Sequence, residues 1–258
     1  MEVLILLGIV LIHELGHAIA AHYFDWRIKR VTILPFGGEM ETDEHGNRPW
    51  KEELMVTIAG PIQHIWLFGL AMALYAYGLL PESLYHIWLI YNTVILLVNL
   101  IPIWPLDGGK LLFILLCRMF PFIRAHRLMV LSSVFILFIA LLGLLLINPL
   151  NFNWWFIIGF LAFSLWREWK HRQYVFMRFL MARHYGHNSN IKGICSLEAE
   201  KDMKIYKVLE NFKKNNKHII VVKNKDIELG KLDETEILHA CFASKLAYRP
   251  VGELLYPY

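Results

Sequence analysis

Five long apolar segments constrain this chain more than any other feature of its sequence. A helix needs about 20 mainly apolar residues to cross a membrane. The segments that meet or approach this requirement are residues 3–24, 54–78, 84–104, 128–148 and 152–168. We therefore expect an all-α polytopic membrane bundle that is embedded in a lipid bilayer.

Charged residues are concentrated in the last third of the chain. Residues 1–168 contain 22 of them (10 basic and 12 acidic), and the rest of the chain contains 26 (16 basic and 10 acidic). The two parts are about 13% and about 29% charged, against roughly 25% in soluble domains. We expect a transmembrane domain over residues 1–168, an interfacial linker helix over 169–195 and a water-soluble domain over 196–258.

The net charge of +4 divides into −2 for the transmembrane part and +6 for the rest. This modest basic excess suits anionic lipid head groups or an acidic partner surface. No basic stripe is interleaved with aromatic residues, so we expect no nucleic-acid partner. The three cysteines, Cys117, Cys195 and Cys241, are widely spaced and form no CxxC pattern, which indicates reduced thiols in a reducing compartment.

Basic residues alternate between the segments that connect the spans. Residues 25–53, residues 105–127 and the segment after the last span contain Lys and Arg, whereas 79–83 and 149–151 contain none. The positive-inside rule places the basic segments and the tail in the cytoplasm. With five spans, the N-terminus is expected outside.

The first apolar segment contains His13-Glu14-Leu15-Gly16-His17, which has the form HExxH. Residues four apart share one face of a helix, so His13 and His17 can present two imidazoles to one tetrahedral zinc ion. Glu14 is then placed to act as a general base on water. Ionisable side chains at membrane depth are costly, which favours a functional site over interhelical hydrogen bonding or chance.

A zinc site with two histidines needs a third protein ligand. Near the end of the third span, Pro102 and Pro105 break the helix, and two glycines follow Asp107. We expect the span to unwind just before Asp107, whose carboxylate is the favoured third ligand. The alternative is that Asp107 only caps the helix that follows.

Other polar residues of the spans are weaker candidates. Asn92 and Asn99 lie seven residues apart, on one helical face, so both can point inward. His64, in the second span, is expected to make an interhelical hydrogen bond rather than to serve as a fourth ligand.

Residues 31–34, followed by Pro35–Gly38, predict a short strand and turn at the membrane interface. A free strand edge there would pair with an unwound substrate and hold it extended over the zinc. An ordinary interfacial hairpin is an equally good interpretation.

The C-terminal region predicts a small α/β unit. Ile205, Val208, Leu209 and Phe212 have helical spacing, residues 219–222 form a buried strand, and residues 233–236 begin another helix with a capping box. The order of elements is similar to a single cystathionine-beta-synthase (CBS) module. That resemblance implies pairing into a homo-oligomer and an adenine nucleotide such as ATP; a substrate-docking domain without nucleotide is the alternative.

The motifs together resemble the site-2 protease family of intramembrane zinc metalloproteases. The sequence HELGH (His13–His17) is followed two spans later by NxxPxxPxDG (Asn99–Gly108). Ala59–Pro61 in the second span and Leu34–Gly38 in the first loop extend the match. With a C-terminal domain, the arrangement is similar to the sporulation branch of that family.

This resemblance implies that His13, His17 and Asp107 bind zinc, that Glu14 activates water and that Asn99 positions the substrate. It implies a membrane-associated sigma-factor precursor as the substrate and sporulation inhibitory membrane proteins as partners. The implied location is the mother-cell membrane surrounding the forespore. Members of this type have another span before the HExxH helix, so we expect a span to be missing here.

Two other functions use the same residues. A membrane metal transporter would use the His and Asp side chains as a transit site, but it would not need Glu14, and the inverted repeats it would show are not found. An enzymatically dead scaffold leaves the pairing of HExxH with Asp107 unexplained. A zinc endopeptidase explains all four residues and is the predicted function.

Overall fold

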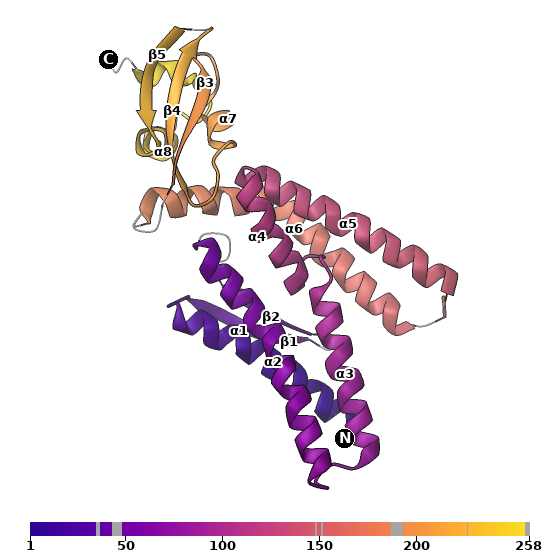
Figure 1. Cartoon of the computed structure of the whole chain (residues 1–258). Helices are drawn as coiled ribbons and strands as arrows, with labels where there is room; N and C mark the ends of the chain where they lie inside the picture. The colour runs from indigo at the N-terminus through magenta and orange to yellow at the C-terminus, as the bar shows by residue number, and fades with distance from the viewer. Residues whose placement is uncertain are drawn as a thin grey trace. The chain divides into compact units, whose positions relative to one another are not determined.

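The computed structural model describes residues 1–34, 37–42, 48–147, 149–150, 152–186, 193–225 and 227–255. The chain divides into two compact units (Figure 1). The first consists of Met1–Ile114 and Met129–Trp169, and the second of Leu115–Leu128 and Lys170–Tyr258. The predicted boundaries at 168 and 195 stay a prediction.

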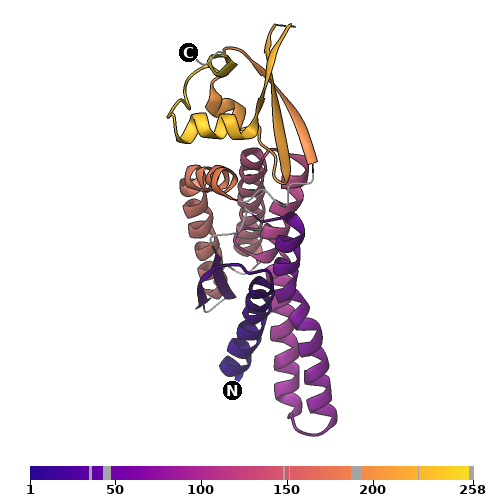
Figure 2. The same ribbon diagram turned by 90° about the vertical axis from the view of Figure 1, so that its left-hand side faces the viewer.

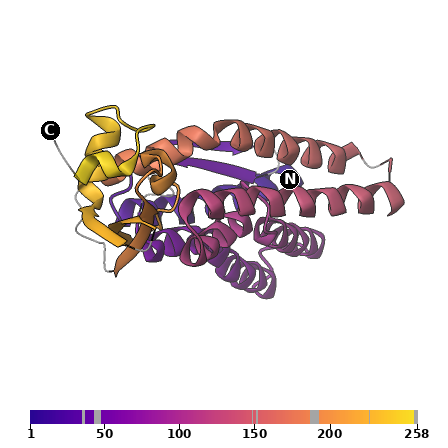
Figure 3. The ribbon, with the colours of Figure 1, turned by 90° about the horizontal axis from the view of Figure 1, so that it is seen from above.

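Long helices dominate the N-terminal two thirds of the chain. They are α1 (Glu2–Tyr23), α2 (Trp50–Ala76), α3 (Glu82–Leu100), α4 (Asp107–Met119), α5 (Phe122–Ile147) and α6 (Phe152–Tyr185). Helices α1, α2 and α3 contact one another, and Figure 2 shows α2 and α3 side by side. Figure 3 shows α5 beside the first part of α6. The predicted helical bundle is therefore present.

A two-stranded antiparallel hairpin follows α1. Its strands are β1 (Ile28–Leu34) and β2 (Gly37–Thr42), and both contact α1. The predicted strand at 31–34 is confirmed as part of β1. Pro35 and Phe36, which were expected in the turn, lie outside the described residues.

Four helices of the described chain are long and apolar enough to cross a membrane: α1, α2, α3 and α5. The fifth predicted span, 152–168, forms the first half of α6, which is not among them. Trp154, Trp155 and Trp166 lower the hydropathy of that segment, and its helix continues into a strongly charged second half that ends at Tyr185. Because the predicted orientation depended on five spans, the side of the membrane on which each end lies stays a prediction.

The chain leaves α3 at Leu100 and becomes helical again at Asp107, as the two prolines predict. The glycines after Asp107 allow the start of α4 to approach the end of α3. A Cβ atom on Gly108 would lie 2.2 Å from the carbonyl oxygen of Leu100, and one on Gly109 would lie 2.5 Å from the carbonyl carbon of Ile103. Asp107 is thereby held as the first residue of α4.

The C-terminal region folds into a three-stranded sheet covered by short helices. The elements are β3 (Gly193–Glu200), α7 (Ile205–Leu209), β4 (Asn216–Asn224), β5 (Ile227–Asp233), α8 (Glu234–Phe242) and the 3₁₀ helix η1 (Val251–Leu255). The strand order is β3-β4-β5, with β3 parallel and β5 antiparallel to β4. Figure 2 shows α7 and α8 on one side of the sheet. The predicted α/β unit is present, and its CBS-like character stays a prediction.

The capping box predicted at residues 233–236 is confirmed. Asp233 caps α8 and accepts a hydrogen bond from the backbone N–H of Thr235, while the Glu236 side chain accepts one from the backbone N–H of Asp233. Of the apolar residues with helical spacing, Ile205, Val208 and Leu209 lie in α7, whereas Phe212 lies beyond the end of this helix at Leu209; all four are buried.

A buried ionic network joins α6 to the sheet of the second unit. Arg183 donates two hydrogen bonds to the Glu234 carboxylate, at 2.5 and 2.9 Å, and others to the carbonyl oxygens of Lys213 and Asn216. Glu234 also accepts hydrogen bonds from the backbone N–H of His218, at 2.8 Å, and from its Nδ1, at 3.0 Å. Both oxygens of the buried carboxylate are therefore paired.

This network contributes to the pH dependence of the tail. Burial acts to raise the pKa of the Glu234 carboxyl, but the hydrogen bonds from His218 and the charge of Arg183 outweigh it and hold the pKa below its usual value of 4.5. A carboxyl whose pKa is lower in the folded state contributes stability above its unfolded pKa. That contribution is lost as the pH falls below 4.5 through the folded pKa.

We expect Glu234→Gln to lower the free energy of unfolding of the second unit at pH 7 by about 3–5 kcal/mol, because it leaves Arg183 buried without its counter-ion. Hydrogen–deuterium exchange of the β4 amides in the full chain, corrected for intrinsic rates, measures the change. Glu228→Gln is the control, since Glu228 is half exposed in a surface pair with Lys231. Equal protection in both variants would contradict this account of the network.

Candidate metal centre

Side-chain atoms of three residues, from two helices, lie close together. His13 and His17 project from consecutive turns of α1, and Asp107 begins α4. The Nε2 atoms of the two histidines are 3.1 Å apart, and each lies 3.1 Å from Oδ2 of Asp107. All three side chains are buried. The three residues predicted as metal ligands are thus brought together.

The hydrogen bond on the far side of His17 fixes which ring nitrogen faces the other two residues. His17 Nδ1 lies 2.8 Å from the carbonyl oxygen of Val56 on α2. A carbonyl oxygen only accepts, so Nδ1 carries the proton and Nε2 presents a lone pair. Oδ2 of an ionised Asp107 also only accepts. With a neutral His17 these lone pairs face each other at 3.1 Å in a buried site, which is unfavourable unless a cation lies between them.

The spacing of these atoms fits zinc. Nitrogen and oxygen ligands lie about 2.0–2.2 Å from a tetrahedral zinc ion, which places neighbouring ligands about 3.3 Å apart. The observed spacing of 3.1 Å is close to that value. Two imidazoles and one carboxylate leave a fourth position open, as in catalytic zinc sites.

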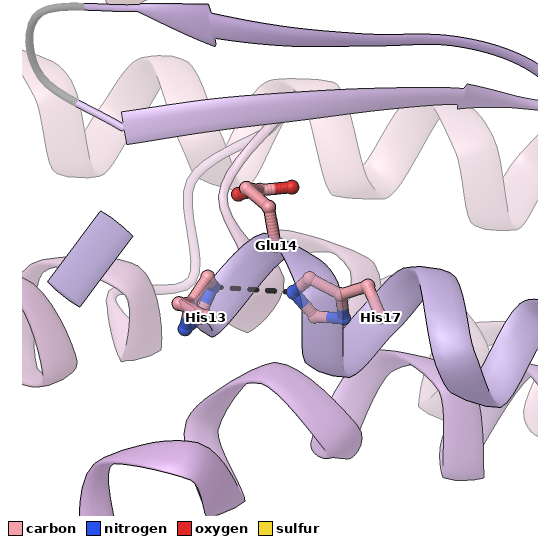
Figure 4. A group of neighbouring side chains, drawn as sticks. All are labelled: His13, Glu14 and His17. Atoms are coloured by element: carbon pink, nitrogen blue, oxygen red, sulfur yellow. Dashed lines mark hydrogen bonds between the residues drawn. The ribbon is translucent and has the colours of Figure 1, made fainter. Parts of the chain in front are cut away.

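Glu14 lies beside the histidine pair. Its carboxylate and the ring nitrogens of His13 and His17 lie within 4.8 Å of one another, and it is buried. Figure 4 shows it projecting from the same turn of α1, toward the strands of the hairpin. A buried carboxylate therefore lies next to the two imidazoles.

Helix α2 approaches the histidine pair through a glycine. A Cβ atom on Gly60 would lie 2.2 Å from His17 Nε2 and 2.8 Å from His13 Cε1. On the other helix, a Cβ atom on Gly16 would lie 2.6 Å from the carbonyl oxygen of Ala59. The absence of a side chain at Gly60 therefore leaves room for both imidazoles, and glycine at position 16 allows α1 and α2 to approach closely.

Two polar residues lie next to the site, and neither was predicted to take part in it. His64 makes the expected interhelical hydrogen bond, to Asn92 on α3, but it also lies 3.1 Å from His13 Nδ1. Both His64 and Asn92 are fully buried. Asn99 lies in the last turn of α3, is half-buried and makes no side-chain hydrogen bond within the described part of the chain. The seven-residue separation of Asn92 and Asn99 places both on one face of α3, and this was the sequence signal that pointed to Asn92.

Comparison with known proteins assigns the family. The sequence profile of peptidase family M50 matches residues 1–80 and 76–141, which is more than half of the chain. The chain therefore belongs to peptidase family M50, the site-2 proteases, and is a zinc metalloprotease. Stage IV sporulation protein FB of Bacillus subtilis is 48% identical over 257 residues, which cover 99% of this chain and 88% of that protein.

Similarity also extends to an archaeon. A zinc metalloprotease of Methanocaldococcus jannaschii is 27% identical over 144 residues, 54% of this chain and 41% of that protein. The solved structure of a site-2 protease from the same organism aligns with a TM-score of 0.55 at 25% identity, over 64% of this chain and 76% of that one. Family membership favours the protease over the transporter and the scaffold.

Proposed function

We propose that the chain hydrolyses a peptide bond of a membrane-associated substrate, with zinc held by His13, His17 and Asp107 and with Glu14 as the general base. One observation carries this proposal. Three buried ligand atoms, mutually 3.1 Å apart, lie next to a buried carboxylate. The histidines belong to a helix apolar enough to lie within a bilayer, so hydrolysis takes place at membrane depth.

Each residue of the proposed site has its own role in the reaction. When bound, zinc supplies Lewis acidity, which polarises the scissile carbonyl and lowers the pKa of a water molecule. Glu14 accepts a proton from the attacking water and returns it to the nitrogen of the leaving amine. His17, anchored to the Val56 carbonyl, and Asp107, anchored at the start of α4, keep the ligand set in place. Asn99 is proposed to hold the substrate backbone.

The substrate must be unwound before it is cut, because the peptide bonds of a helix are sheltered by their hydrogen bonds. The β1–β2 hairpin contacts the helix that carries Glu14. We propose that one of its strand edges pairs with the extended substrate.

The proposed substrate is the precursor of a sporulation sigma factor. The resemblance to the sporulation branch of the family supports it, as does the name of the B. subtilis relative, a sporulation protein. The same resemblance supports sporulation inhibitory membrane proteins as partners. It also supports a location in the mother-cell membrane around the forespore, with the tail in the cytoplasm. For the tail, ATP binding and homo-oligomer formation through a CBS-like domain rest on the similarity of its sequence alone.

Zinc content and cleavage of a sigma-factor precursor, measured together on the purified chain in detergent, test this proposal. We expect one zinc ion per chain and cleavage that a chelator abolishes and zinc restores. Asp107→Ala removes one of three protein ligands, so it should weaken zinc binding by about 100-fold or more. Loss of a residue that only orients a metal ligand usually weakens binding by about 10–100-fold. Asp202→Ala, on an exposed turn of the tail, is the control. Undiminished zinc in Asp107→Ala would contradict the proposed ligand set.

A further inference from the structure

We propose that His64 and Asn92 are positioning residues that fix which ring nitrogen of His13 carries the proton. This inference builds on the zinc site proposed above. It concerns only the direction of three hydrogen bonds behind His13, which link α1, α2 and α3.

The amide of Asn92 can adopt only one orientation. Its Nδ2 atom lies 3.0 Å from the backbone carbonyl oxygen of His64. A carbonyl oxygen accepts and never donates, so the amide atom facing it must be the NH₂ group. The other terminal atom, Oδ1, lies 2.6 Å from His64 Nδ1. An amide oxygen accepts, so His64 Nδ1 must carry a proton and donate it.

The direction of the remaining bond follows. A neutral imidazole with a proton on Nδ1 has a lone pair on Nε2. His64 Nε2 lies 3.1 Å from Nδ1 of His13. His13 Nδ1 must therefore be the donor, and its Nε2 is left with a lone pair that faces Asp107 and His17. Asn92 thus sets the metal-binding tautomer of His13 through His64.

Burial makes this chain of bonds hard to bypass. His64 and Asn92 are fully buried, and His13 is 2% exposed, so no bulk solvent can replace a missing partner. Reversing His13 would leave Nδ1 and His64 Nε2 facing each other as two acceptors, which is unfavourable in a buried site.

The two histidines of the HExxH motif are held differently. His17 donates to the backbone carbonyl of Val56, which no substitution removes, whereas His13 depends on two side chains. The expected consequence is that replacement of His64 or Asn92 impairs zinc binding through His13 alone.

Zinc affinity of the purified full chain, measured by competition with a chelator, tests the inference. His64→Leu removes the acceptor for His13 Nδ1, and the expected loss of affinity is about 10–100-fold, as for other partners that orient a metal ligand. His64→Gln keeps an acceptor oxygen at a similar reach and is expected to retain most of the affinity. The visible spectrum of the cobalt-substituted chain should change in His64→Leu and not in His64→Gln.

A second pair of variants tests the hydrogen bond between Asn92 and His64, which lies one residue further from the zinc ligands. Asn92→Gln keeps both an acceptor for His64 Nδ1 and a donor for the His64 carbonyl, whereas Asn92→Leu removes both, so Asn92→Leu should weaken zinc binding much more than Asn92→Gln. Should His64→Leu fail to fold, the Asn92 pair decides by the same comparison. Thr93→Val is the control, because Thr93 is the neighbouring residue on α3 but is exposed, and its hydroxyl donates to the Leu89 carbonyl.

Three results are decisive. The inference is wrong if His64→Leu and Asn92→Leu bind zinc as tightly as the unmodified chain. It is also wrong if the conservative variants are as weak as the leucine variants, because the loss would then come from packing. Absence of zinc from the unmodified chain would overturn the proposed function instead.

Discussion

Glu14→Gln is expected to slow proteolysis severely while zinc remains bound. The substitution keeps the size of the side chain and removes only its ability to take a proton, and Glu14 is not one of the three residues whose atoms converge at 3.1 Å. General base catalysis contributes about 10²–10⁴-fold to a rate, so the cleavage rate should fall by that factor. Cleavage of the precursor and zinc content are measured on the same preparation.

Glu2→Gln is the matched control, because Glu2 lies in the first turn of the same helix and is exposed. It should cleave at the unmodified rate. If Glu14→Gln also cleaved at that rate, Glu14 would not be the base, and a loss of zinc from Glu14→Gln would instead make it a ligand.

Gly60→Ala is expected to disrupt the metal centre, although Gly60 itself provides no metal ligand. Its Cβ atom would lie 2.2 Å from His17 Nε2, whereas ordinary contacts begin at 3.4 Å. The imidazole must therefore move by about 1 Å, and metal ligands tolerate only about 0.2 Å. A displacement of this size costs about 100-fold in catalysis. Zinc content and cleavage rate should fall together.

Gly69→Ala provides the comparison on the same helix. A Cβ atom there would have no neighbour within 4 Å, and alanine favours a helix over glycine by about 1 kcal/mol. This variant should bind zinc and cleave normally. If Gly60→Ala behaved like Gly69→Ala, the close approach of α2 to the histidines would have no role in forming the site.

The sequence predicted the parts of the site that depend on local rules. The spacing of His13 and His17 follows from the helical repeat, and the break before Asp107 follows from Pro102 and Pro105. That Asp107 meets the histidines, about ninety residues away, was expected because zinc needs a third ligand and because the motifs resemble those of the site-2 protease family. The capping box of α8 was also predicted, because its residues, like those of the break before Asp107, are close together in the chain.

The rest of the site depends on contacts between helices. The hydrogen bonds that join His64 to His13 and to Asn92 connect three helices, and no periodicity specifies which polar side chains meet across such an interface. The need for glycine at position 60 becomes visible only when α1 and α2 are packed. The fifth span was predicted from apolar residues alone, and the structure shows these residues to be part of the longer, partly charged helix α6.

X-ray absorption at the zinc edge, on the purified chain, tests most directly whether His13, His17 and Asp107 hold a zinc ion. The account predicts one zinc ion per chain, coordinated by two imidazoles and by oxygen at about 2.0–2.2 Å, with no sulfur ligand. The imidazole signal should disappear in a chain with both His13→Ala and His17→Ala. Zinc that persists with the same imidazole signal in that double variant would contradict the account.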